Sequence, residues 1–302
     1  MNVRQCVEFV AQQFAAADLY YGHGTDNAWD EAVYLVFTVA GLPFGDDADV
    51  ADQLLDDVMQ RRVEALTLRR IEERRPMAYL LQEAWFAGLP FHVDERVLIP
   101  RSPIAELVLN QFEPLLAAPP ARILDLCTGS GCIGIAAALA FPEAKVDLSD
   151  IAPDALELAQ RNIRRHGLGQ RVATIESDLF AQLKGPYDLI IANPPYVSAQ
   201  EVADLPPEYR HEPVGALLSE ADGLDLPLAI LRQAANLLTT HGVLVMEVGY
   251  SGPLLAERHP EFPVTWLAFE HGGEGVLAIA KADLASVQTA TTVGPAAPKF
   301  VR

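Results

Sequence analysis

The feature that most constrains the fold is a regular alternation of strand and helix patterns between residues 121 and 281. Seven short runs of aliphatic, β-branched and aromatic residues indicate strands, at residues 121–127, 144–150, 172–178, 187–193, 242–249, 262–269 and 276–281. Helical patterns lie between them, at residues 132–141, 153–166 and 226–238. This alternation predicts a doubly wound α/β fold, with helices on both faces of a mostly parallel seven-stranded sheet. The last two strands are joined only by residues 270–275, too few for a helical crossover, so they should pair antiparallel near the C-terminus.

The first part of the chain has a different pattern. Up to about residue 75, apolar residues recur at spacings of three and four, which predicts helices. Residues 76–104 change toward aromatic and β-branched residues punctuated by glycine and proline, which predicts a short β-hairpin connector. We therefore expect four segments: a small all-α domain at residues 1–83, the connector at 84–104, the α/β domain at 105–282 and a flexible tail at 283–302.

Composition limits the classes of partner. The chain has 302 residues, with 22 Lys and Arg against 41 Asp and Glu and a formal net charge of −19. It repels a phosphate backbone, so stable nucleic-acid binding is not expected. The three cysteines offer neither a paired framework nor a CxxC metal spacing, and no apolar run is long enough to span a membrane. We predict a cytoplasmic protein without a metal site, in which Cys127 and Cys132 are small buried thiols.

A glycine-rich turn follows the first predicted strand of the α/β domain. Gly129, Gly131 and Gly134 satisfy the GxGxxG spacing between this strand and the next helix. The motif by itself fits a nicotinamide dinucleotide, whose pyrophosphate approaches a helix N-terminus, and equally a nucleoside-bearing cofactor without phosphates.

Three aspartates at strand ends favour the second kind of cofactor. Asp125, inside the turn, would repel a pyrophosphate but can face the positively charged side of S-adenosylmethionine. Asp150 ends the second strand, where a carboxylate can accept both ribose hydroxyls, and Asp178 follows the third, placed to meet the adenine amino group. Each of them could instead only cap the helix that follows, but three in succession favour a cofactor site.

The fourth strand ends abruptly at Asn193, followed by Pro194, Pro195 and Tyr196. Prolines cannot donate to a strand ladder, so the strand stops beside the first strand, at the sheet edge where ligands of open α/β sheets bind. A planar nitrogen is a poor nucleophile because its lone pair is delocalised. The Asn193 side-chain oxygen and the Pro194 carbonyl can each accept one N–H of such an acceptor, and Tyr196 offers a flat face for stacking. This stretch is therefore the predicted catalytic centre of a methyl transfer to nitrogen.

These residues resemble the class I S-adenosylmethionine-dependent methyltransferases of the protein-(glutamine-N5) group, which carry an NPPY signature and a helical N-terminal domain. The resemblance extends to about residue 282 and includes DLCTGSGCIG, SDIAPDALELAQRN, SDLF, DLIIANPPYV and EPVGALLSEADGLD. Release-factor enzymes of the group have a sequence close to IPRPDTE after the connector, whereas this chain has VLIPRSPIAEL and, nearer its start, YGHGTDNAWDEA. Both segments resemble the branch that methylates a glutamine in the third protein of the large ribosomal subunit. The resemblance implies this activity, with a substrate-docking role for residues 1–83.

The resemblance also implies the roles of individual residues. Cofactor contacts are expected at Asp125, Thr128, Gly129, Ser130, Gly131, Asp150, Ile151, Asp178, Leu179 and Asn193. Asn193, Pro194 and Tyr196 would be catalytic, and the substrate would meet Asn193, Pro194, Pro195, Tyr196 and Arg101. An equally good interpretation of Arg101 is a connector arginine paired with a nearby acid. Much of the wider family has DLGTGSG, so Cys127 replaces a glycine, which we do not expect to affect cofactor binding.

The charge also bears on when the enzyme would act. An acidic enzyme attracts a free, basic ribosomal protein and is repelled by assembled rRNA, so we expect it to act before or during ribosome assembly.

Several alternative functions stay open at this point. The release-factor branch differs only in substrate docking. A DNA adenine-N6 methyltransferase could use the same asparagine and prolines, although the charge opposes it. A non-catalytic assembly factor and a nicotinamide dehydrogenase are also possible, but the second leaves the asparagine and prolines unexplained.

Overall fold

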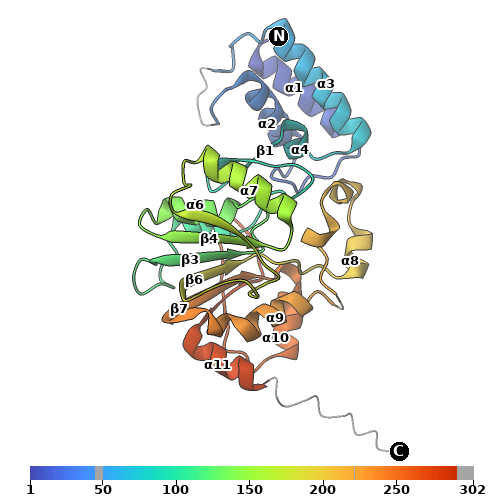
Figure 1. Cartoon of the computed structure of the whole chain (residues 1–302). Helices are drawn as coiled ribbons and strands as arrows, with labels where there is room; N and C mark the ends of the chain where they lie inside the picture. The colour runs from blue at the N-terminus through green and yellow to red at the C-terminus, as the bar shows by residue number, and fades with distance from the viewer. Residues whose placement is uncertain (45–49, 221, 291–302) are drawn as a thin grey trace, which may run out of the picture. The chain divides into compact units, whose positions relative to one another are not determined.

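The computed structural model describes residues 1–44, 50–220 and 222–290 (Figure 1). The chain forms two compact units, each described here by itself. The first unit contains Met1–Arg101 together with Asp204–Val214, and the second contains Ser102–Ala203 and the chain from Gly215 onward. The sequence did not predict that residues after the fourth strand would join the N-terminal unit.

The first unit is mainly helical. Its elements are α1 (Val3–Ala16), α2 (Ala28–Ala40), α3 (Asp57–Glu73), α4 (Met77–Leu81), a β1–β2 hairpin (Glu83–Phe86 and Leu89–His92) and a 3₁₀ helix at Pro207–His211. Asn2, Asn27 and Asp56 begin the first three helices, because each side chain accepts a hydrogen bond from the backbone N–H three residues later. The predicted helices and the predicted hairpin are both present, and β1 pairs with β2 antiparallel.

The second unit contains a seven-stranded sheet in the order β5-β4-β3-β6-β7-β9-β8. The strands are β3 (Arg122–Leu126), β4 (Lys145–Asp150), β5 (Val172–Glu176), β6 (Tyr187–Ala192), β7 (Leu238–Glu247), β8 (Thr265–Trp266) and β9 (Val276–Ala280). The first five run parallel, whereas β9 pairs antiparallel with both β7 and β8. The predicted fold class is therefore confirmed.

The strand order places a ligand site between β3 and β6. From β3 the chain moves outward to β4 and β5, and it then returns to build β6 and β7 on the other side of β3. In open α/β sheets, the loops that leave the carboxyl ends of two such strands diverge and leave a crevice for a ligand. The glycine turn follows β3 and the Asn-Pro-Pro-Tyr stretch follows β6, so both lie at this point.

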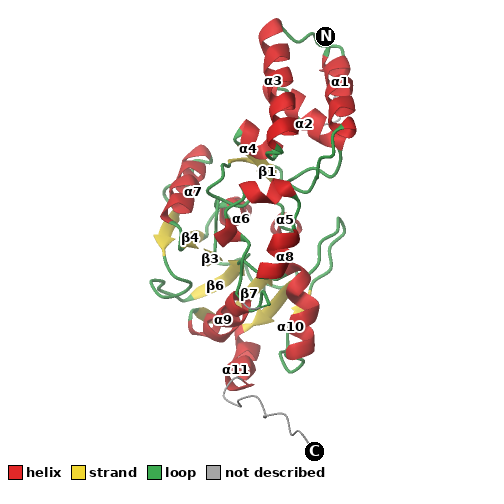
Figure 2. Ribbon diagram, turned by 90° about the vertical axis from the view of Figure 1, so that its right-hand side faces the viewer, coloured by secondary structure: helices red, strands yellow, loops and turns green. Residues whose placement is uncertain are grey.

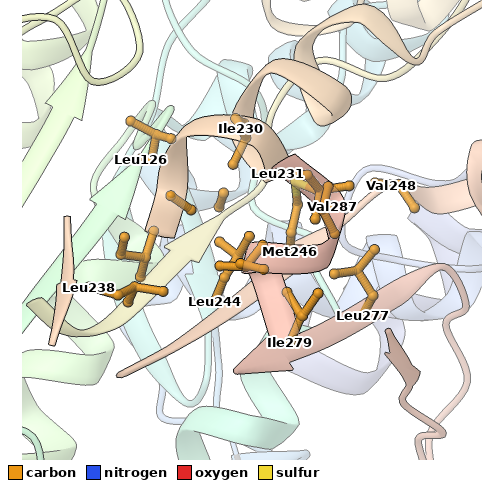
Figure 3. Packing of buried hydrophobic residues seen from close by; sticks show 14 of the residues in the cluster. Leu126, Ile230, Leu231, Leu238, Leu244, Met246, Val248, Leu277, Ile279 and Val287 are labelled. Atoms are coloured by element: carbon orange, nitrogen blue, oxygen red, sulfur yellow. The ribbon is translucent and has the colours of Figure 1, made fainter. Parts of the chain in front are cut away.

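Helices pack on this sheet from both sides (Figure 2). The α-helices after Ser102 are α5 (Ile104–Leu109), α6 (Cys132–Ala140), α7 (Pro153–Arg165), α8 (Ala199–Asp204), α9 (Asp225–Gln233), α10 (Gly252–Arg258) and α11 (Lys281–Ala290). Helices α6 and α7 contact β3, β4 and β5, whereas α11 contacts α9, β7 and β9. Alternate residues of the central strands build the core beneath α9 and α11. Figure 3 shows Leu244 and Met246 of β7 in this core with Ile230 of α9 and Val287 of α11.

The C-terminal region differs from the expected flexible tail. Residues 281–290 form α11, in which Leu284 and Val287 are fully buried. The spacing of three between these two residues places both on one helix face, a signal that the surrounding small and polar residues obscure. Residues 291–302 lie outside the described residues. No helix in the described ranges has the length and apolar character that crossing a bilayer requires.

Candidate active site

The glycine turn combines two different uses of glycine. A Cβ on Gly134 would lie 2.2 Å from the Leu148 side chain and 2.8 Å from Cβ of Asp125, so only glycine lets α6 pack this closely on the sheet. Gly131 has φ +82°, and its Cβ would meet the side chains of the same interior. A Cβ on Gly129 would instead meet no atom within 4 Å. The backbone at Gly129 is therefore open to a ligand.

Asp125 is buried beneath this turn, with 1% of its surface exposed. Its Oδ2 accepts hydrogen bonds from the Thr128 hydroxyl (2.5 Å) and from the Gly134 N–H (2.8 Å). Its Oδ1 is buried and has no hydrogen-bond partner among the described residues. Burial raises the pKa of Asp125 to about 7, although the two hydrogen bonds partly oppose the shift. This unpaired oxygen fits a cofactor that brings a cationic N–H donor.

Asp150 connects the glycine turn to the end of β4. Its Oδ2 accepts a hydrogen bond from the Gly129 N–H (2.9 Å) and its Oδ1 accepts one from the Ala152 N–H (3.0 Å). The carboxylate is half-buried, and the neighbouring Ile151 side chain is 64% exposed. Asp150 therefore holds the open Gly129 backbone in place and keeps a partly exposed edge of its own.

The remaining predicted cofactor residues have diverse positions. Ser130 is 2% exposed, and its carbonyl accepts a hydrogen bond from the Asn162 side chain (2.8 Å). Asp178 is exposed, and its N–H bonds to the Gln182 side chain (3.2 Å). Leu179 is half-buried with φ +45°. Hydrogen bonds thus bring together Asp125, Thr128, Gly129 and Asp150, whereas Ser130 and Asp178 bond to other residues.

Asn193 and Pro194 follow directly after β6, whose last residues pair with the end of β3. Asn193 is half-buried, and its side-chain amide makes no hydrogen bond to any described residue. The Pro194 side chain is buried, Pro195 is half-buried, and the Pro194 carbonyl accepts no hydrogen bond within the described chain. The side-chain oxygen of Asn193 and the carbonyl oxygen of Pro194 therefore have no hydrogen-bond donor among the described residues, and both follow the strand next to the glycine turn.

Tyr196 is held on several sides. Its hydroxyl donates to Glu247 Oε1 (2.6 Å), and its carbonyl accepts from the Ser251 hydroxyl (2.9 Å). A Cβ on Gly249 would lie 2.5 Å from the Tyr196 ring, and one on Gly223 would lie 2.3 Å from the Tyr196 carbonyl oxygen. Both glycines have positive φ angles, +47° and +87°. Glycine at these two positions lets the chain approach Tyr196 closely, which fixes the plane of the ring.

Glu247 and Ser102 are site residues that the sequence analysis missed. Glu247 ends β7, is 6% exposed, and its Oε2 accepts a hydrogen bond from the Ser102 hydroxyl (2.5 Å). The pattern held a usable signal, because Glu247 is an acid at the end of an otherwise apolar strand, at the same sheet edge as the other site residues. Glu247 thus links Ser102, from the connector end, to Tyr196.

Arg101 belongs to the first unit. Its guanidinium forms two hydrogen bonds to the Glu212 carboxylate (2.7 and 2.9 Å) and lies 5.4 Å from the centre of the Tyr209 ring. This arrangement matches the alternative interpretation of Arg101, an arginine paired with a nearby acid.

Comparisons with known proteins give the family. Residues 105–205 match the family model described as "Methyltransferase small domain". The chain is 42% identical to the ribosomal protein uL3 glutamine methyltransferase of Francisella tularensis, over 96% of this chain and 93% of the relative. It is 45% identical to the protein of the same name from Neisseria gonorrhoeae, over 91% of this chain and 92% of the relative. The chain belongs to the ribosomal protein uL3 glutamine methyltransferase family.

A solved structure agrees with the fold of this uL3 glutamine methyltransferase family member. The hMettl16 catalytic domain, crystallised with the MAT2A 3′UTR hairpin 1, superposes with a TM-score of 0.51 at 19% identity. The match covers 82% of this chain and 90% of that chain. This likeness concerns the fold alone. The two curated relatives carry the name of the ribosomal-protein branch, which the connector and the YGHGTDNAWDEA segment predicted.

Proposed function

We propose that this protein transfers a methyl group from S-adenosylmethionine to the side-chain amide nitrogen, N5, of a glutamine in ribosomal protein uL3. Family membership supports the reaction class. The observation that carries the chemistry is the pair of acceptors at Asn193 and Pro194, which have no protein donor and lie one strand away from the glycine turn.

The proposed cofactor fits the residues at the turn. Asp125 Oδ1 would accept a hydrogen bond from the cofactor's cationic amino group, and the open backbone at Gly129 leaves room for close approach. Asp150 would hold the ribose hydroxyls with its exposed edge, and the exposed Asp178 would accept a hydrogen bond from the adenine amino group. When bound, S-adenosylmethionine supplies the electrophilic methyl group. Ile151, Leu179, Thr128 and Ser130 would complete the walls of this site.

The substrate amide needs to be held and polarised, because its nitrogen lone pair is delocalised. Asn193 Oδ1 and the Pro194 carbonyl would each accept one N–H of the glutamine, which aligns the nitrogen and favours its rehybridisation as positive charge develops. Tyr196, fixed by Glu247 and Gly249, would stack against the amide plane. No strong general base is required, because the nitrogen becomes easier to deprotonate once transfer has begun.

We propose the following division of labour along the chain. The helical segment at residues 1–83 docks the protein substrate, residues 84–104 connect it, and residues 105–282 carry the methyl transfer. The net charge of −19 favours a free, basic protein and disfavours assembled rRNA. Methylation would therefore take place in the cytoplasm before or during ribosome assembly, without stable binding to nucleic acid.

One experiment tests both the reaction and the substrate. Purified enzyme is incubated with methyl-labelled S-adenosylmethionine and, in parallel, with free uL3, assembled large subunits, a release factor and duplex DNA. We expect label in free uL3 only, on a glutamine, and its loss in Asn193→Ala while cofactor binding persists. Label in the release factor or DNA would refute the substrate assignment. Cofactor binding without label anywhere would favour a non-catalytic assembly factor.

A further inference from the structure

The first unit contains a mostly apolar cavity of about 330 Å³ that the reaction chemistry does not use. Its wall includes His23, Thr25 and Asp30 from the segment that begins α2, the aromatic rings of Phe44 and Trp85, and Pro100. All of these residues lie within Met1–Arg101, so the cavity belongs to this unit by itself.

A segment that distinguishes this chain from the release-factor pattern meets the connector at this cavity. His23, Thr25 and Asp30 lie in YGHGTDNAWDEA, which distinguishes the chain, whereas Pro100 lies in the IPR of the connector that both patterns share. The two segments are about seventy residues apart in sequence, so their meeting results from the fold. Because His23, Thr25 and Asp30 belong to a segment that resembles only the ribosomal-protein branch, their position in the cavity wall favours a role of this cavity in choosing the substrate.

One buried carboxylate ties the two segments together. Glu212 accepts hydrogen bonds from the Ile99 N–H (3.0 Å) and from Arg101, and it lies 3.5 Å from His23 Nε2. The His23 ring also packs against Tyr209, with 4.5 Å between ring centres. These contacts hold His23 and the connector residues in fixed positions at the cavity wall.

A second observation points to a ligand. His23 is 6% exposed and lines the cavity, yet its Nδ1 is buried and has no hydrogen-bond partner among the described residues. Buried polar atoms are seldom left unpaired, because each unpaired atom costs about 1–3 kcal/mol. A polar group of an occupant that enters the cavity would complete this site.

The remaining wall selects the class of occupant. Phe44 and Trp85 form an edge-to-face pair with 5.2 Å between ring centres, and each is 40% exposed. Asp30 supplies a carboxylate, and the described lining contains no lysine or arginine. Aromatic faces beside a lone carboxylate suit a long side chain with an apolar stem and a cationic end. An entirely apolar occupant would leave His23 Nδ1 without a partner, whereas the exposed Asp30 carboxylate already accepts a hydrogen bond from the Asn27 side chain (2.7 Å) through Oδ2.

We propose that this cavity docks a lysine or arginine side chain of the basic protein substrate and thereby selects that substrate over a release factor. This inference rests on the proposed function, because it concerns the protein that the enzyme methylates. The stem of the docked side chain lies against Trp85 and Phe44, and its cationic end approaches Asp30. Docking here affects how the substrate is held and leaves the reacting groups in the second unit unchanged.

Steady-state methylation of free uL3 by the full-length enzyme tests this proposal. Trp85→Ala should raise KM for uL3 about two- to thirtyfold, the range that cation–π contributions give, and Asp30→Asn should raise it about two- to fivefold, as an exposed ion pair gives. In both variants kcat and the affinity for S-adenosylmethionine should stay within about twofold. Trp29→Ala is the matched aromatic control, because Trp29 is 50% exposed and does not line the cavity. Asp57→Asn is the matched charge control, because Asp57 is an acid in the first turn of α3. Both controls should leave KM unchanged.

A binding measurement keeps the test independent of activity. N-acetyl-arginine amide should shift the Trp85 indole resonance and compete with uL3 at millimolar concentration, whereas N-acetyl-norleucine amide should not. Equal competition by both amides would show an apolar occupant and overturn the proposal. Unchanged KM in both cavity variants, with uL3 methylated normally by the wild-type enzyme, would also overturn it and leave the proposed function intact. No methylation of uL3 by the wild-type enzyme would refute the proposed function instead, and the arginine-amide arm would still test the cavity.

Discussion

At the scale of single residues, Tyr196 shows how a side chain is fixed without being part of a regular element. Its hydroxyl bonds to Glu247, its carbonyl bonds to Ser251, and Gly249 lies against its ring. An aromatic ring that stacks on an amide is useful only if its plane is correct when the substrate arrives. The buried Glu247 carboxylate is therefore a positioning group for Tyr196.

The first prediction tests this role. Tyr196→Phe removes the 2.6 Å hydrogen bond to Glu247 but keeps the ring. A hydrogen bond to a charged group contributes about 1.5–3 kcal/mol, so kcat should fall roughly tenfold or more while cofactor affinity changes less than about twofold. Single-turnover methylation and cofactor titration measure the two quantities. If Glu247 acts through Tyr196, adding Glu247→Gln to Tyr196→Phe should lower kcat little further; multiplicative losses would contradict the link.

The second prediction concerns pH. Burial raises the pKa of Asp125 to about 7, so the carboxylate is mostly protonated at pH 6 and mostly ionised at pH 8. A cationic cofactor binds the ionised form better, so affinity for S-adenosylmethionine should rise by roughly tenfold from pH 6 to pH 8. Isothermal titration across this range measures it. The cofactor's own amino group also titrates near pH 8, but Asp125→Asn keeps that contribution, so only the wild-type profile should contain the additional rise.

At the scale of elements, the turn between β3 and α6 contains glycines that should fail in different ways. Gly134→Ala drives a methyl group into Leu148 and the sheet, so the free energy of unfolding should fall by about 1–3 kcal/mol or more. Gly129→Ala meets no protein atom but occupies the open backbone at φ +54°. It should cost only about 1–2 kcal/mol of stability and reduce cofactor affinity at least tenfold. Chemical denaturation and cofactor titration measure the two quantities; an unchanged cofactor affinity in Gly129→Ala would contradict this assignment.

The same turn shows what sequence can predict about elements. The strand and helix patterns predict the sheet, its antiparallel end and the positions of Asp125, Asp150 and Asn193, because parallel strands bring their carboxyl ends to one edge. Hydrogen-bond partners depend on packing between segments far apart in sequence. Ser102 and Glu247 therefore had no local signal of their contact with each other. Helix α11 was missed because only Leu284 and Val287 mark its buried face.

At the scale of the whole molecule, the first unit depends on acids that the chain supplies much later. Glu208 accepts hydrogen bonds from the Tyr20 N–H and pairs with Arg74, while the buried Arg70 contacts both Glu31 and Glu208. Glu212 pairs with Arg101 in the same way. Buried arginines need such partners, because an uncompensated buried charge costs about 3–5 kcal/mol.

The last prediction follows from Glu212. Burial by itself would raise its pKa, but Arg101 and His23 outweigh burial and lower the pKa to about 2 from an ordinary 4.5. A lowered folded-state pKa contributes stability that is present above pH 4.5 and is lost as pH falls toward 2, here about 3 kcal/mol. Glu212→Gln should therefore destabilise the protein at pH 7, and its deficit should shrink between pH 4.5 and pH 2. Denaturant unfolding at several pH values measures this; a deficit independent of pH would contradict it.

The excursion of residues 204–214 into the first unit has a consequence for how this protein could be divided or recombined. The Ser219 N–H donates a hydrogen bond to the Val197 carbonyl (2.9 Å), so the chain that leads into the excursion and the chain that returns from it meet next to Tyr196. A fragment cut after Arg101 would lack Glu208 and Glu212 and would leave Arg70 without one of its counter-charges. A chimera that exchanges the first unit between relatives would therefore have to move two separate pieces of chain, and the second piece starts only eight residues after Tyr196. The first unit and the loop that contains Tyr196 are therefore connected closely along the chain, so a change in the length of one segment constrains the other.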